Sequence, residues 1–144
     1  MLNKGYFYKT AIVAVVSVML YSFNGFNTVN RQDGLKQSIE RGKKIYTQTC
    51  VSCHQVNGTG VPHLAPPLKG TDYVLKNKPR LIHIVLDGFN EDVEIEGEYY
   101  VNPMPAFNTL NDQQVADVLT YIRNSFGNKA DAVTAAEVKA QRKK

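Results

Sequence analysis

Apolar residues recur with the spacing of an α-helix in two stretches of the chain. In the first stretch the apolar positions are Leu35, Ile39, Ile45 and Tyr46. The second begins after Asn111, a typical N-cap residue with Gln114 three positions later, and ends at Gly127. Its apolar face is formed by Val115, Val118, Leu119, Ile122 and Phe126. The pattern predicts an amphipathic N-terminal helix and a well-delimited last main helix.

Shorter elements are predicted between these two helices. Pro79 favours the start of a third helix over residues 80–87, which Gly88 would end. Residues 58–68 contain three prolines and two glycines, and we expect a loop there. Residues 93–101 alternate apolar and acidic side chains around a glycine, which indicates a small β-hairpin.

Length and composition allow one domain with appendages, because the chain has 144 residues of which 43% are apolar. We expect a folded domain over residues 31–130, a separate segment at 1–30 and a basic tail at 131–144. The tail is rich in alanine, and Thr134-x-x-Glu137 has the pattern of a capping box. A short helix is therefore predicted in the tail.

The first thirty residues have the features of an export signal. Lys4 and Lys9 precede an apolar run at positions 11–23, which has the length of a signal-peptide core. The uncharged stretch from Thr10 to Asn30 is 21 residues long, enough to span a bilayer. A small-residue cleavage site does not follow the run, so we favour a membrane anchor over a signal peptide. Both alternatives export the following domain to the periplasmic side of the inner membrane.

Both cysteines lie in the pentad Cys50-Val51-Ser52-Cys53-His54. This C-x-x-C-H pattern is the attachment signature of a c-type haem, which two thiols bind covalently while the imidazole reaches the iron. Three alternatives are weaker. Zinc would need four ligands, and no second pair completes the set. A thioredoxin-type pair should follow a strand, whereas helix is predicted before Cys50. A disulfide between Cys50 and Cys53 would close too short a loop to stabilise much.

Met104 is the methionine best placed to act as a second iron ligand. Met1 is the initiator and Met19 lies in the apolar N-terminal run, whereas Met104 stands between Pro103 and Pro105. The two prolines stiffen the backbone without helix or strand hydrogen bonds, which suits a loop that holds a weak ligand. The commoner use of methionine, as an adaptable filler of a core, fits such a loop poorly.

Two histidines outside the pentad are alternative ligands. His63 lies in the predicted loop on the same side of the sequence as His54, so that it reaches the opposite face of a haem only with difficulty. His83 lies in a predicted helix among apolar residues, where a hydrogen-bonded core or surface histidine is the usual finding. Met104 is therefore the expected partner of His54.

These motifs together resemble class I c-type cytochromes, over roughly residues 35–128. The similarity is to small bacterial monohaem domains, found alone or joined to nitrite reductases, oxidase subunits and dehydrogenase complexes. The matching segments are Gly60-Val61-Pro62, Ala65-Pro66-Pro67-Leu68, Met104-Pro105-Ala106-Phe107 and the run 119–128. The resemblance implies an all-α fold of about three to five helices around one covalent haem, preceded by an N-terminal hydrophobic helix.

The resemblance also implies roles for single residues. Cys50 and Cys53 would carry the thioether bonds, His54 would be the proximal ligand and Met104 the distal ligand. Pro66 matches a proline whose carbonyl accepts the other N–H of the proximal imidazole.

Further positions follow from the same likeness. Leu68 matches a residue packed on the porphyrin, and Tyr99 and Tyr100 are candidates for hydrogen bonds to a haem propionate. Gly42 would allow the first and last helices to cross closely, with Tyr46 and Tyr121 packed at the crossing.

An iron with both His54 and Met104 bound has no open position for a substrate, so the expected function is a one-electron carrier and not an enzyme. The alternative is a haem-based sensor or a peroxidase-like site from which Met104 dissociates. The expected partners are redox proteins, and nucleic acid is not expected. The formal net charge is +4, but the charges are unevenly distributed along the chain, because residues 87–98 are rich in Asp and Glu. This acidic segment would steer a basic partner at low salt.

Overall fold

The computed structural model describes residues 31–142. Its contacts divide the chain into two compact units, Met1–Gly34 and Leu35–Lys144. The predicted signal peptide or anchor at 1–30, with its hydrophobic helix, lies outside the described residues. Within residues 31–142, no helix is both long enough and apolar enough to cross a membrane. The following description concerns the second unit and the four residues that precede it.

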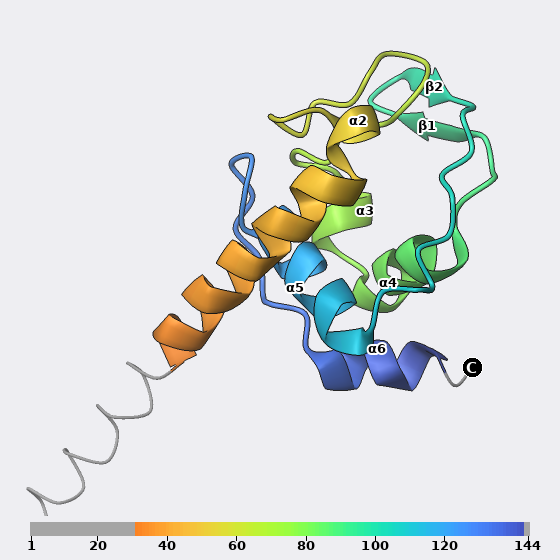
Figure 1. The fold of residues 1–144 in the computed structure, drawn as a ribbon. Coiled ribbons are helices and arrows are strands. Elements are labelled where there is room, and N and C mark those ends of the chain that lie inside the picture. The colour runs from red at the N-terminus through yellow and green to blue at the C-terminus, as the bar shows by residue number, and fades with distance from the viewer. Residues whose placement is uncertain (1–30, 143–144) are drawn as a thin grey trace, which may run out of the picture. The chain divides into compact units, whose positions relative to one another are not determined.

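Helices and one small hairpin make up the regular structure (Figure 1). Residues 31–49 are helical, and the hairpin consists of β1 (Val93–Ile95) paired antiparallel with β2 (Glu98–Tyr100). The other helices are α2 (Val51–His54), α3 (Asp72–Leu75), α4 (Lys78–Asp87), α5 (Asp112–Arg123) and α6 (Ala135–Arg142). The hairpin prediction is confirmed. The described residues hold six helices, more than predicted, because α2 and α3 are single turns too short to show a period.

Local signals explain where the longer helices begin and end. Asn111 and Gln114 form the predicted capping box at the start of α5, with two reciprocal hydrogen bonds of 2.9 Å. The helix ends at Arg123, earlier than the predicted Gly127, since Asn124 already leaves the helical conformation. Gly88 ends α4 with a positive φ of 81°, a conformation that glycine adopts without a steric penalty.

The helix at 31–49 crosses α5 at Gly42, as the resemblance implied. A Cβ atom at Gly42 would lie 2.0 Å from the carbonyl oxygen of Asp117, so that only glycine allows this approach. The rings of Tyr46 and Tyr121 pack at the crossing with centroids 5.3 Å apart. The crossing therefore sets the position of the end of the first helix, from which the cysteine motif follows.

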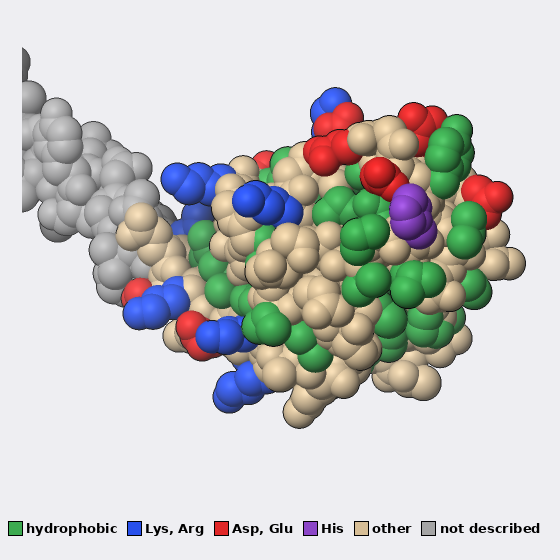
Figure 2. Space-filling model, turned by 90° about the horizontal axis from the view of Figure 1, so that it is seen from above, with side chains coloured by type: hydrophobic (Ala, Val, Ile, Leu, Met, Phe, Trp, Pro, Cys, Tyr) green, Lys and Arg blue, Asp and Glu red, His purple; other side chains and the backbone are tan. Residues whose placement is uncertain are grey.

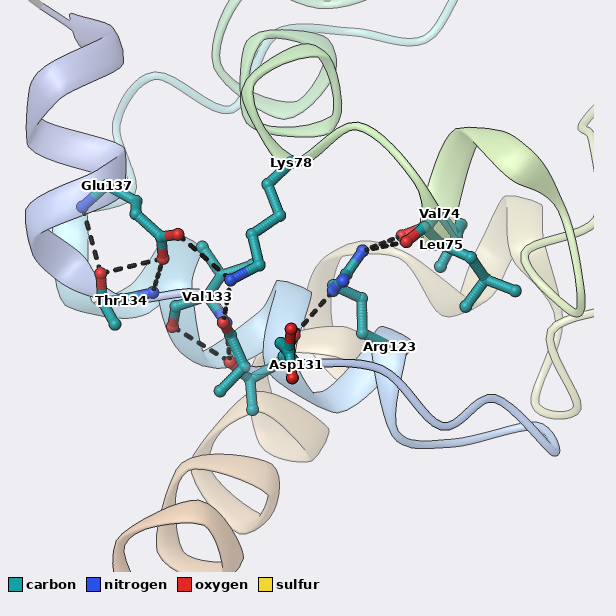
Figure 3. Close-up of polar contacts among 10 residues, drawn as sticks. Val74, Leu75, Lys78, Arg123, Asp131, Val133, Thr134 and Glu137 are labelled. Carbon is teal, nitrogen blue, oxygen red and sulfur yellow. Dashed lines mark hydrogen bonds and ion pairs between the residues drawn. The ribbon is translucent and has the colours of Figure 1, made fainter. Parts of the chain in front are cut away.

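The C-terminal segment packs against the core and is held by polar contacts (Figure 3). Glu137 accepts hydrogen bonds from the backbone and hydroxyl of Thr134, which confirms the predicted capping box at α6. Lys78 of α4 donates to the carbonyl of Ala132 at 2.7 Å and to Glu137 at 3.1 Å. Val138 of α6 is fully buried. This segment is thus part of the folded unit.

Candidate haem site

An apolar cavity collects the four residues that the sequence singles out. Cys50, Cys53, His54 and Met104 all line it, although Met104 is fifty positions from His54 in the chain. The remaining wall is largely apolar and comes from several elements, including Leu68, Val74, Leu81, Val85, Leu119 and Ile122. A flat apolar ring system is the kind of group that such a wall accommodates.

His54 is held in one orientation by the loop that follows it. Its Nδ1 lies 3.0 Å from the carbonyl oxygen of Pro66, as the resemblance implied. Since a carbonyl only accepts, Nδ1 carries the proton and Nε2 is left as the nitrogen available to a metal. Burial lowers the pKa of the imidazole, partly offset by the bond to Pro66. The ring is therefore neutral near pH 7, the form that binds iron.

No disulfide joins Cys50 and Cys53. The two side chains lie within one turn of chain, Cys53 on α2 and Cys50 as the residue before that helix. Because helix precedes the pair, the thioredoxin interpretation does not apply. Within residues 31–142 no three His, Cys, Asp or Glu side chains gather closely enough to hold a metal ion. The zinc interpretation therefore has no support in the described part of the chain.

Met104 is fastened by backbone hydrogen bonds to the end of α4. Its N–H donates to the carbonyl of Phe89 at 2.8 Å, and its carbonyl accepts from the N–H of Phe89 at 3.0 Å. Gly88 permits this approach, since a Cβ there would lie 2.7 Å from the Met104 carbonyl oxygen. Sequence reasoning recognised Gly88 only as a helix stop and did not predict the role of Phe89, because neither position carries a signal for a distant partner.

The alternative ligands lie elsewhere. His63 and His83 are not among the residues that line the cavity. His63 is exposed and lies 3.2 Å from Glu98, while His83 forms a contact of 2.8 Å with Asp87 on its own helix. The structure therefore brings Met104, and neither of these histidines, to the cavity wall.

The two tyrosines of the hairpin, Tyr99 and Tyr100, lie differently with respect to the cavity. Tyr100 is buried and lines the cavity, whereas Tyr99 is 59% exposed and does not, because neighbouring residues of a strand point to opposite faces.

Asn128 fastens the loop that follows His54. Its side-chain amide donates to the carbonyls of Leu68 and Ile122, and its side-chain oxygen accepts from the N–H of Gly70. Sequence reasoning missed this role, although a buried asparagine after a helix end needs such partners.

The side chains that line the cavity are those of a c-type haem protein: two cysteines, a neutral imidazole and a methionine thioether. The residues present thus fit a covalent haem. The family model described as cytochrome c matches residues 39–126. A cytochrome c-552 of Thermus thermophilus is 37% identical over 120 residues, covering 77% of this chain and 80% of the relative.

Two other relatives are much longer proteins. The gluconate 2-dehydrogenase cytochrome c subunit of Pantoea cypripedii is 39% identical over 108 residues, which cover 72% of this chain but 24% of the relative. The alcohol dehydrogenase (quinone) cytochrome c subunit of Gluconacetobacter polyoxogenes is 37% identical over 100 residues, which are 67% of this chain and 21% of the relative. The chain belongs to the cytochrome c family, carries one covalent c-type haem and serves in electron transfer.

Proposed function

We propose that His54 and Met104 bind the haem iron from its two faces, and that the protein is a one-electron carrier with no open coordination site. The observation that carries the proposal is that both side chains line the same cavity. Each is fixed by backbone groups, His54 by the Pro66 carbonyl and Met104 by Phe89. Ligands held in this way need little rearrangement when the iron changes its oxidation state.

The chain's own residues define the electronic character of the site. When bound, a c-type haem supplies reversible exchange between Fe(II) and Fe(III). The neutral sulfur of Met104 favours the reduced state and raises the reduction potential. The apolar wall acts in the same direction, since a low-dielectric surrounding disfavours the additional positive charge of ferric iron. The proposed carrier is therefore one of comparatively high potential.

The absorption spectrum of the ferric protein tests this assignment. The wild type should show the weak near-red band that arises from a methionine–iron bond, and Met104→Ala should lose it. The potential of Met104→Ala should fall by on the order of 0.1 V or more, since axial ligands set haem potentials over roughly 0.8 V. His63→Ala is the matched control, because His63 is exposed and does not line the cavity, and it should keep the band.

The same spectrum separates the carrier from the alternative function. A wild-type spectrum without the band at neutral pH, together with rapid binding of added ligands such as cyanide, would contradict the proposal. That outcome would favour a sensor or a peroxidase-like site with a labile Met104.

We further propose that the partners are redox proteins with a basic surface. Two relatives are named as cytochrome subunits of dehydrogenases, which supports a redox enzyme as donor or acceptor. Glu91 lines the cavity, and Asp92, Glu94, Glu96 and Glu98 follow it on exposed positions of the hairpin region. Figure 2 shows apolar and acidic side chains side by side on one face, with basic side chains mostly toward the other side of the view. An export signal or membrane anchor at residues 1–30 would place this face in the periplasm.

A further inference from the structure

The last residue of α6 contacts the chain just beyond Met104. Arg142 donates from Nε to the Asp112 carboxylate at 2.6 Å and from Nη1 to the Asn108 carbonyl at 3.1 Å. Its Nη2 donates to the carbonyl of Leu110. Asn108 and Leu110 follow Met104 by four and six positions. One guanidinium thus binds three groups at the junction between the methionine segment and α5.

The methionine segment, residues 101–111, contains no helix or strand, and its one regular feature is the bridge at Met104. Two contacts tie it to the end of α4: the paired hydrogen bonds with Phe89 and a bond of 2.9 Å from the Phe107 N–H to the Val85 carbonyl. The contacts with Arg142 tie its C-terminal end to α6. Met104, Phe107 and Leu110 all line the cavity. The contacts with α4 and those with Arg142 therefore hold the same part of the cavity lining.

Arg142 is presented from a helix that is itself firmly held. At the N-terminal end of α6, Lys78 binds Glu137, as Figure 3 shows. Lys78 also donates to the carbonyl of Ala132. In the middle of α6, Val138 is fully buried. The Arg142 guanidinium therefore extends from a helix whose position is fixed. The Arg142 side chain is 28% exposed. Local opening of the methionine segment must break these contacts or move α6 with it.

We propose that Arg142 is a positioning residue for Met104, because it fixes the C-terminal end of the methionine segment against α6. The planar guanidinium directs several donors at once to a carboxylate and two carbonyls, whereas a lysine ammonium reaches fewer acceptors without a fixed fork. When these bonds are lost, the segment opens more often and the sulfur of Met104 spends more time away from the iron. The inference rests on the proposed function, in which Met104 is an iron ligand.

The test compares Arg142→Ala, Arg142→Lys and the control Lys139→Ala in the full-length haem protein. Lys139 lies on the same helix, is exposed and has no hydrogen-bond or ion-pair partner among residues 31–142. Hydrogen exchange of the Met104 and Phe107 amides should be about tenfold faster in Arg142→Ala, since local opening governs exchange. Exchange in the centre of α5 should not change. Arg142→Lys should show an intermediate effect and Lys139→Ala none.

A titration with imidazole adds a readout at the iron. Imidazole competes with Met104 for the ferric site, so its apparent affinity rises with the population of the open segment. Arg142→Ala should bind imidazole about tenfold more tightly than the wild type and Arg142→Lys by a smaller factor. Equal exchange rates in Arg142→Ala and the wild type would overturn the inference. Faster exchange with an unchanged imidazole affinity would overturn it too, because Arg142 would then fasten the segment without positioning the ligand. A wild type without the methionine–iron band would instead refute the proposed function.

Discussion

Replacing Gly42 by alanine tests the helix crossing on which the cysteine motif depends. A Cβ at this position would lie 2.0 Å from the Asp117 carbonyl oxygen and 2.6 Å from its carbon. It would also lie 2.8 Å from the Cβ atom of Tyr121. These neighbours are the backbone of α5 and the first atom of a side chain, so none of them can turn away. The two helices must move apart to accept one methyl group.

The expected loss follows from two opposing effects. In a helix interior, alanine is favoured over glycine by about 1 kcal/mol. Overpacking costs typically about 1–3 kcal/mol, and contacts with an unyielding backbone belong at the upper end of that range. The net loss for Gly42→Ala should thus be about 2 kcal/mol. At a urea dependence of about 2 kcal/mol per molar, this loss lowers the midpoint of unfolding by about 1 M.

Urea denaturation of the purified ferric protein, followed by far-ultraviolet circular dichroism, measures this loss. Gly34→Ala is the matched control, because Gly34 lies on the same helix and a Cβ there meets nothing within 4 Å. That substitution should leave the stability unchanged or raise it by up to about 1 kcal/mol. If Gly42→Ala proved as stable as Gly34→Ala, the close crossing would be refuted.

Two further predictions concern charges. Burial favours a raised pKa for Asp117, but hydrogen bonds from Arg41, Ser38 and Gln113 outweigh it and hold this pKa below its ordinary value. The stabilisation is therefore present at neutral pH and lost as the pH falls below about 4. Urea titrations at neutral pH and below about pH 4 should find the wild type and Asp117→Asn closer in stability at the lower pH. The same difference in unfolding free energy at the two pH values would contradict this prediction. Because Glu91 lines the cavity, electron exchange with cationic hexaammineruthenium should slow between about 0.01 M and about 0.15 M salt, whereas exchange with anionic ferricyanide should not. The same salt dependence for both reagents would contradict the proposal that the acidic residues beside the cavity take part in docking.

Those parts of the fold that depend on neighbours in the sequence were predictable. The capping boxes at Asn111 and Thr134, the stop at Gly88 and the hairpin after Val93 all follow from residues within a few positions of one another. The pentad that ends at His54 is equally local. Such signals depend on backbone geometry over one turn, and distant contacts leave them unchanged.

The contacts that Phe89, Asn128 and Arg142 make near the site were not predictable, since each of them joins segments far apart in the chain. Phe89 holds Met104 through backbone groups that every residue possesses, so no side-chain signal marks the position. Asn128 reaches Leu68 over sixty positions, and Arg142 reaches Leu110 over more than thirty. A polar side chain near a helix end has many possible partners, and the packing of the whole unit selects among them.

These distant contacts share one consequence for the proposed ligands. The His54 side is held by Pro66, whose loop Asn128 fastens to α5. The Met104 side is held between α4 and α6. Because α5 packs against both α4 and α6, the two sides of the cavity have a common support in the helical core. A change in that core should therefore alter the geometry at both ligands, whereas a change at Arg142 should affect the Met104 side alone.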